Sequence, residues 1–132
     1  MVFDAVILAG GRGSRLGGAS KARLLRGHVT LLELAIRATD GARQVVVVGD
    51  VDEDPGYTLT RETPAFSGPV AAVAAGVSLL SPAPGDFTLV LACDIPDSAA
   101  AVTALRLHVE GRATADGAIA RDATGHQQYL LG

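Results

Sequence analysis

Uninterrupted apolar runs alternate with stretches of helical period along most of this chain. Residues 3–9, 44–49 and 87–92 are almost entirely apolar, as strands are when helices cover both faces of a parallel sheet. Residues 58–61 follow a turn with proline and glycine, and they predict a shorter strand. Because helical stretches separate most of these runs, the pattern predicts crossover connections and a mainly parallel sheet.

Two helices are predicted from a capping residue at one end and a glycine at the other. Thr30 opens a Thr-x-x-Glu capping box, and Gly41 stands just past the end of that helix. Asp97 or Ser98 caps a later helix, which Gly111 closes. The apolar faces are Leu31, Leu34, Ala35 and Ala38 in the first helix, and Val102, Leu105 and Val109 in the second.

A further helix is predicted to start at Gly68-Pro69, since proline suits the first helical position. Its apolar side chains at helical spacing are Val70, Val73, Val77 and Leu80. An internal glycine costs a helix about 1 kcal/mol relative to alanine, so Gly76 indicates close packing against the sheet. Residues 118–121 and 128–131 predict a final antiparallel hairpin. The predicted fold class is α/β: a Rossmann-like, mainly parallel sheet with helices on both faces, ending in that hairpin.

The composition favours a folded protein without metal clusters or disulfides. Hydrophobic residues make up 48% of the 132 residues, and no apolar stretch reaches the roughly 20 residues that span a bilayer. The one cysteine, Cys93, excludes an internal disulfide and fits a reducing compartment. The three histidines are too scattered for a zinc site. We therefore expect a cytoplasmic protein that binds no membrane, with Cys93 as a small core residue.

Positive charge is concentrated near the N-terminus. The net charge of −3 argues against general nucleic-acid binding, yet no acidic residue occurs between Asp4 and Glu33. That stretch holds five of the eleven basic residues: Arg12, Arg15, Lys21, Arg23 and Arg26. Such a local patch on an acidic protein suits a small polyanion. Lys21 is the chain's single lysine, which indicates a place for a compact ammonium group.

A glycine-rich segment, LAGGRGSRLGGASK at residues 8–21, follows the first predicted strand. Its spacing fits neither the G-x4-G-K-[ST] loop of ATPases nor the G-x-G-x-x-G dinucleotide fingerprint. It predicts an extended loop whose backbone amides can surround phosphates; the alternative is a plain surface loop. In parallel sheets, ligands bind beyond the carboxyl ends of the strands. This segment, the turn at residues 48–50 and Cys93-Asp94 are therefore expected at one edge.

Three motifs in order resemble those of molybdenum cofactor guanylyltransferases, within the wider group of nucleotidyltransferases. The first is L-A-G-G-x-x-x-R-L-G-G-x-x-K at the glycine-rich segment. RETPAFSGPVAAVAAG at 61–76 resembles the family's nucleotide-side loop and following helix, and LACDIP at 91–96 resembles its metal-binding strand end. The final DATGHQQYLL stretch also resembles the family. The resemblance implies transfer of GMP from GTP to the phosphate of molybdopterin cofactor, with Mg²⁺ as cofactor and contacts with molybdoenzymes or other cofactor-biosynthesis proteins.

The resemblance also implies roles for particular residues. The expected nucleotide-binding residues are Leu8, Ala9, Gly10, Gly11, Gly13, Ser14, Arg15, Lys21, Glu62 and Asp94. Arg15 and Lys21 would neutralise phosphate charge and Asp94 would bind Mg²⁺, so these three are the predicted catalytic residues. A hard carboxylate ligand beside a cationic loop suits Mg²⁺; the alternative role for Asp94 is a helix cap.

The chain departs from the family's pattern at three places. Ser20 stands where an acidic residue usually precedes the lysine, and Glu62 stands near the family's nucleotide-side aspartate. Family members also continue beyond position 132. We therefore expect residues 1–132 to be a single nucleotide-binding domain that lacks the family's C-terminal acceptor-binding part.

Three alternatives stay open at this point. LAGGRGSRL also matches sugar-1-phosphate nucleotidyltransferases, although in those the lysine lies further from the arginine. A cytidylyltransferase for the same cofactor usually has alanine at the position of Gly10. The third alternative is a nucleotide-binding module without catalytic activity.

Overall fold

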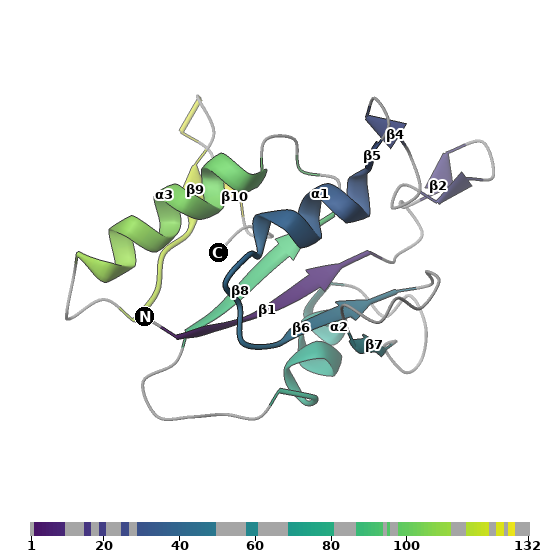
Figure 1. Ribbon diagram of the computed structural model, residues 1–132, viewed down its shortest axis with the longest axis horizontal. Coiled ribbons are helices and arrows are strands. Elements are labelled where there is room, and N and C mark those ends of the chain that lie inside the picture. Colours follow the sequence, from purple (N-terminus) through teal and green to yellow (C-terminus); the bar gives the residue numbers. More distant parts are fainter. Residues whose placement is uncertain are drawn as a thin grey trace.

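The fold centres on a parallel sheet of four strands, seen in a computed structural model of the chain (Figure 1). The structure describes residues 2–9, 15–16, 19–20, 25–26, 29–49, 58–60, 69–80, 87–93, 95, 98–111, 116–121, 124–125 and 127–128. The strands, in the order β7-β6-β1-β8, are β7 (Thr58–Thr60), β6 (Val45–Val48), β1 (Phe3–Leu8) and β8 (Phe87–Ala92). All three neighbouring pairs run parallel. The predicted class, a mainly parallel α/β sheet, is confirmed.

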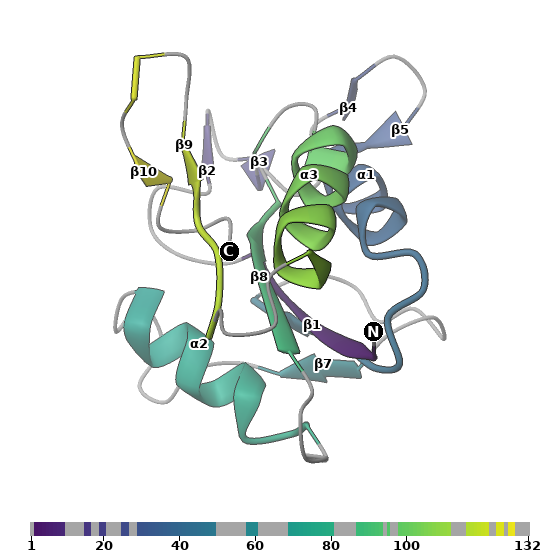
Figure 2. The ribbon, with the colours of Figure 1, turned by 90° about the vertical axis from the view of Figure 1, so that its left-hand side faces the viewer.

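Helices cover both faces of this sheet, as predicted. They are α1 (Leu31–Ala38), α2 (Pro69–Val77) and α3 (Ser98–Glu110). Figures 1 and 2 show α1 and α3 together on one face and, among the described elements, α2 on the other. The chain passes from β1 through α1 to β6, and later from β7 through α2 to β8 on the far side of β1. Strand order therefore reverses at β1.

The side chains of β1 alternate between two separate cores. Phe3, Ala5 and Ile7 lie in the core beneath α1 and α3, where Ala35 and Val102 meet them. The intervening apolar side chains of β1, with the matching ones of β6, form a second core beneath α2: Val6, Leu8, Val46 and Val48. Every residue of β1 is buried, because a central parallel strand with helices on both faces exposes neither side.

The helix faces agree with the predicted ones in part. Val102 is buried in α3, with Leu105 packed beside it, as expected. In α2, by contrast, Val70 is 83% exposed and Val77 is 43% exposed. Val73, and Leu80 just beyond the helix, pack against the core beneath α2 as predicted, and Ala72 joins them there. The predicted α2 face was therefore wrong at Val70 and Val77, because the helix turns its small residues toward the sheet.

Short antiparallel pairs accompany the main sheet. β2 (Arg15–Leu16) pairs with β3 (Ala19–Ser20), and β4 (Leu25–Arg26) pairs with β5 (Val29–Thr30). Near the end of the chain, β9 (Ala120–Arg121) pairs with β10 (Gln127–Gln128). The remainder of the longer hairpin expected over 118–131 stays a prediction, since residues 129–131 lie outside the described ones.

An ion pair fixes the amino end of β1. Asp4 is only 3% exposed, and the Arg43 guanidinium donates to both of its carboxylate oxygens, from Nε at 3.0 Å and from Nη2 at 2.7 Å. Gln44 Nε2 adds a longer contact of 3.4 Å. The Arg43 amide also donates to the Phe3 carbonyl at 2.8 Å. A buried carboxylate is costly without partners, so Asp4 needs this arginine. Because Arg43 lies just before β6, the pair also joins the start of β1 to that part of the chain.

Beside this pair, a residue of α3 meets the end of α1. The Arg106 guanidinium lies 4.6 Å from the centre of the Phe3 ring, and its Nη1 donates to the Asp40 carbonyl at 3.3 Å. Gly41 follows α1 with φ of +90°, a conformation that glycine adopts readily at helix ends. Gly41 was predicted to stand at this point, and that prediction is confirmed. Within the described part of the chain, no helix has the length and apolar character needed to cross a bilayer.

Candidate functional site

Backbone hydrogen bonds hold the carboxyl ends of the strands side by side. The Ala9 amide donates to the Val48 carbonyl at 2.8 Å, and the Cys93 amide donates to the Leu8 carbonyl at 3.0 Å. At the outer strand, the Gly49 amide donates to the Thr60 carbonyl at 2.9 Å. The register agrees, because Leu8 pairs with both Val48 and Ala92. These bonds bring the carboxyl ends of β1, β6, β7 and β8 to one edge of the sheet, called the carboxyl edge below.

The carboxyl edge is where the predicted site was expected. Leu8 and Ala9 lie at its centre, both buried, between the ends of β6 and β8. Asp94 follows Cys93 directly, and Glu62 comes two residues after Thr60. The predicted residues outside the described ones are Gly10, Gly11, Gly13, Ser14, Lys21, Glu62 and Asp94. Their roles stay predictions, but the described ends of the strands direct the chain toward one edge.

Part of the glycine-rich segment folds back on itself. Arg15 pairs with Ser20 across the β2–β3 ladder, and Leu16 pairs with Ala19. Lys21 follows Ser20 in the chain. The extended backbone predicted here therefore includes an antiparallel pair of two-residue strands. Two residues are too few to show the alternating pattern from which a strand is predicted. The ladder brings the backbone of Arg15 next to the residue that precedes Lys21.

Gly49 belongs to the turn at residues 48–50 that the sequence placed at this edge, but its backbone conformation was not predicted. It follows β6 directly and is buried. Its φ is +152°, a backbone conformation that residues other than glycine rarely adopt. Its amide is bonded to Thr60, and Val48 beside it accepts the Ala9 amide. The four-valine run ending in a glycine and an aspartate was the available signal. Gly49 therefore sets the backbone direction directly after β6, between the ends of β1 and β7.

The described residues contain no group of three or more side chains of the His, Cys, Asp or Glu type that is suited to hold a metal ion. This finding is compatible with the predicted Mg²⁺ site, because Mg²⁺ commonly binds one or two carboxylates together with substrate phosphates. Cys93 is buried at 5% exposure, as predicted for a core residue. Since its amide donates to the Leu8 carbonyl, Cys93 lies at the centre of the carboxyl edge, and Asp94 follows it in the sequence.

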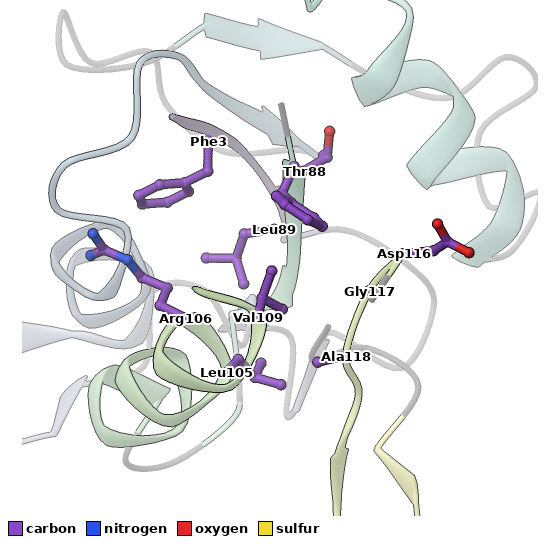
Figure 3. A pocket seen from close by; sticks show the side chains of 10 residues that line it. Phe3, Thr88, Leu89, Leu105, Arg106, Val109, Asp116, Gly117 and Ala118 are labelled. Carbon is purple, nitrogen blue, oxygen red and sulfur yellow. The ribbon is translucent and has the colours of Figure 1, made fainter. Parts of the chain in front are cut away.

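A pocket of about 190 Å³ lies at the opposite end of the sheet (Figure 3). Phe3 and Phe87, which are register partners at the start of β1 and β8, contribute to its lining. Leu105 and Val109 of α3 and Ala118 are also among its mostly apolar lining residues. None of these residues was predicted to bind a ligand. The pocket is separated from the carboxyl edge by the length of β1 and β8.

The fold and this edge define a class of protein. A parallel sheet whose strand order reverses at β1, with a glycine-rich segment leaving the carboxyl end of that strand, is the arrangement of doubly wound nucleotide-binding α/β proteins. More particularly, the chain belongs to the family of the MobA-like NTP transferase domain, whose model matches residues 5–132. The resemblance seen in the three motifs is thereby confirmed.

Two known proteins illustrate the likeness. The chain is 30% identical over 135 residues to a molybdenum cofactor guanylyltransferase of Shewanella frigidimarina (strain NCIMB 400), an alignment that covers 98% of this chain and 67% of that protein. The crystal structure of 2-C-methyl-D-erythritol 4-phosphate cytidylyltransferase from Thermus thermophilus has a similar fold. Its TM-score is 0.57 at 22% identity, covering 97% of this chain and 64% of that one. The chain thus spans about two thirds of the length of each.

Proposed function

We propose that this chain is the nucleotide-binding part of a GTP:molybdenum cofactor guanylyltransferase, which transfers GMP from GTP to the phosphate of molybdopterin cofactor. The observation that carries the proposal is that four strands end at the carboxyl edge. The three family motifs begin at or directly after the ends of three of these strands in the sequence. Membership of the nucleotidyltransferase family and the 30% identity to a guanylyltransferase support it. The proposal also includes contacts with molybdoenzymes or other cofactor-biosynthesis proteins.

The proposed binding mode places the triphosphate along the glycine-rich segment. Leu8 and Ala9 begin the segment at the centre of the edge, and glycines at positions 10, 11 and 13 allow close approach of the backbone to phosphate oxygens. Arg15 and Lys21 supply positive charge to the phosphates. Asp94 holds Mg²⁺, which when bound neutralises phosphate charge and polarises the reacting phosphorus.

The proposed reaction needs no strong general base. A phosphate oxygen of the acceptor is already anionic, and it forms a new bond to the α-phosphorus of GTP. The bond from that phosphorus to the β-phosphate bridging oxygen breaks, and its electron pair leaves with pyrophosphate. Arg15 and Lys21 stabilise the charge that builds up on the leaving group, so rate acceleration comes from positioning and electrostatics.

Calorimetric titration tests the proposal on the chain itself. We expect GTP to bind more tightly than CTP, ATP or dTTP, and Mg²⁺ to strengthen its binding. Asp94→Asn is the matched variant: it keeps the side-chain shape, removes the charge, and should abolish the gain from Mg²⁺. Preferred binding of CTP or dTTP would contradict the guanylyl assignment. The absence of binding for every nucleotide would contradict the nucleotide site itself.

A further inference from the structure

Gly76, in the last turn of α2, is the point where that helix comes closest to the sheet. A Cβ atom built at this position would lie 2.5 Å from Val6 Cγ1 of β1 and 3.0 Å from Val48 Cγ2 of β6. Ordinary van der Waals contact for such an atom is 3.4–4 Å. The helix can hold its present distance from the sheet only because position 76 carries no side chain.

The two valines under Gly76 have little room to yield. Val6 is fully buried at 0% exposure and Val48 is 2% exposed. Val6 also stands in the central strand, where Val46 and Val90 are its register partners on the two sides. Branching at Cβ leaves valine few rotamers with which to move its methyl groups aside. An added atom at position 76 is therefore expected to shift α2 and to leave the strands in place.

The outer side of α2 permits such a shift. Val70 is 83% exposed and Val77 is 43% exposed, so both ends of the helix have side chains facing outward. Among the described elements, Figure 2 shows α2 on the face of the sheet opposite to α1 and α3. A helix moves largely as a rigid rod, and a displacement at Gly76 reaches Pro69 about 10 Å away along the axis.

Pro69 is the first residue of α2 and follows the segment 61–68 directly. That segment contains Glu62 and is the proposed nucleotide-side loop. The core beneath α2 also includes Leu8, the first residue of the glycine-rich segment. The position of α2 on the sheet is therefore linked to both segments that the proposed function assigns to the nucleotide, through Pro69 and through Leu8.

We propose that Gly76 is a positioning residue for the nucleotide: the missing Cβ sets how closely α2 sits on β1 and β6, and thereby where the chain enters the proposed nucleotide-side loop. This inference rests on the proposed function. Gly76 itself touches no substrate, and it acts through the placement of Pro69 and the residues before it.

Three variants of the whole chain test the inference by calorimetric titration with GTP and Mg²⁺. Gly76→Ala should weaken binding by about 10- to 100-fold, because a displacement near 1 Å has effects of that order. Gly117→Ala is the matched control, since a Cβ there meets no atom within 4 Å, and it should bind like wild type. Val6→Ala/Gly76→Ala removes both Val6 methyl groups, which would lie 2.5 and 3.3 Å from the new Cβ, and leaves only the 3.0 Å approach to Val48 Cγ2. It should therefore restore most of the binding.

The outcomes separate this inference from the proposed function. If wild type binds no nucleotide, the proposed function fails first. If wild type binds and Gly76→Ala binds equally well, the positioning role is overturned while the function stands. If Gly76→Ala does not fold, the double variant decides the matter: folding with near-wild-type affinity supports the steric account, and failure to fold or to bind overturns it.

Discussion

The two ends of strand β1 meet their surroundings in different ways. At the amino end, the buried carboxylate of Asp4 is neutralised within the molecule by the Arg43 guanidinium, at 2.7 and 3.0 Å. At the carboxyl end, the described contacts are backbone bonds that join Leu8 and Ala9 to Cys93 and Val48. At the amino end, the charges of Asp4 and Arg43 neutralise each other and thereby stabilise the fold. Backbone bonds hold the strand ends together, and the predicted nucleotide-binding residues follow these ends in the sequence.

This contrast predicts that changes at the amino end affect stability, whereas changes at the carboxyl edge affect nucleotide chemistry. The largest expected effect on stability is that of Arg43→Ala. It leaves the Asp4 carboxylate buried with only the 3.4 Å contact from Gln44 among the bonds described above, so we expect a loss of about 3–5 kcal/mol in the free energy of unfolding. Urea denaturation measures this loss.

Asp4→Ala sharpens the same test. It leaves Arg43, whose side chain is 33% exposed and can be hydrated, so its cost should be smaller, about 1–2 kcal/mol. GTP affinity should stay within about twofold of wild type in both variants at temperatures where they are folded. Equal costs for the two variants would contradict the view that the buried carboxylate dominates this end.

Lys21→Ala tests the other end of the comparison. Loss of one preorganised charge contact to the triphosphate should lower turnover by about 10²–10³ in a protein that performs the transfer. The free energy of unfolding should change by less than about 0.5 kcal/mol. Arg26→Ala is the matched control, because it removes a charge from the same basic stretch at a position with no predicted phosphate contact. Unchanged turnover of Lys21→Ala at saturating GTP would remove Lys21 from the mechanism.

Gly41→Ala is expected to have a moderate effect on stability alone. Its φ of +90° is unfavourable for alanine, which should cost about 1–2 kcal/mol in the free energy of unfolding. Gly117→Ala serves as the control, because its added Cβ meets nothing within 4 Å. Denaturant unfolding with an unchanged m-value reports the difference. A Gly41→Ala variant as stable as the control would show that the turn after α1 relaxes without strain.

The smallest expected effect is that of Arg106→Gln. It removes the cation 4.6 Å from the centre of the Phe3 ring, an interaction that contributes about 0.5–1 kcal/mol. Thermal unfolding at low and high salt should show a small loss, and nucleotide affinity should not change. A marked loss of nucleotide affinity would mean that the two ends of the sheet are coupled, against the comparison drawn above.

The sequence predicted the strands well because their signal is local. The run at 87–92 coincides with β8, and the runs at 3–9 and 44–49 contain β1 and β6. Continuous burial on both faces leaves few polar residues, so the bounds of each strand are visible in composition alone. The same locality placed Gly41 at the turn after α1 and Gly76 against the sheet.

Features that depend on tertiary packing were predicted less well. Val70 and Val77 match the helical period of α2, yet they face outward, since Gly76 and Ala72 allow the closer approach to Val6 and Val48. The order of the strands has no local signal and came from the structure. For the site, sequence located the edge and its motifs, whereas the conformation of Gly49 and the ladder at Arg15 depend on backbone bonds that composition does not encode.

The central claim is that a metal-bound guanosine triphosphate occupies the carboxyl edge of the sheet. A crystal structure of the chain with GTP and Mg²⁺ tests it most directly. We predict triphosphate density along the glycine-rich segment beyond Ala9, with the metal ion on Asp94. Nucleotide bound elsewhere, for example in the apolar pocket beside Phe87 and Leu105, with the carboxyl edge empty, would contradict the account.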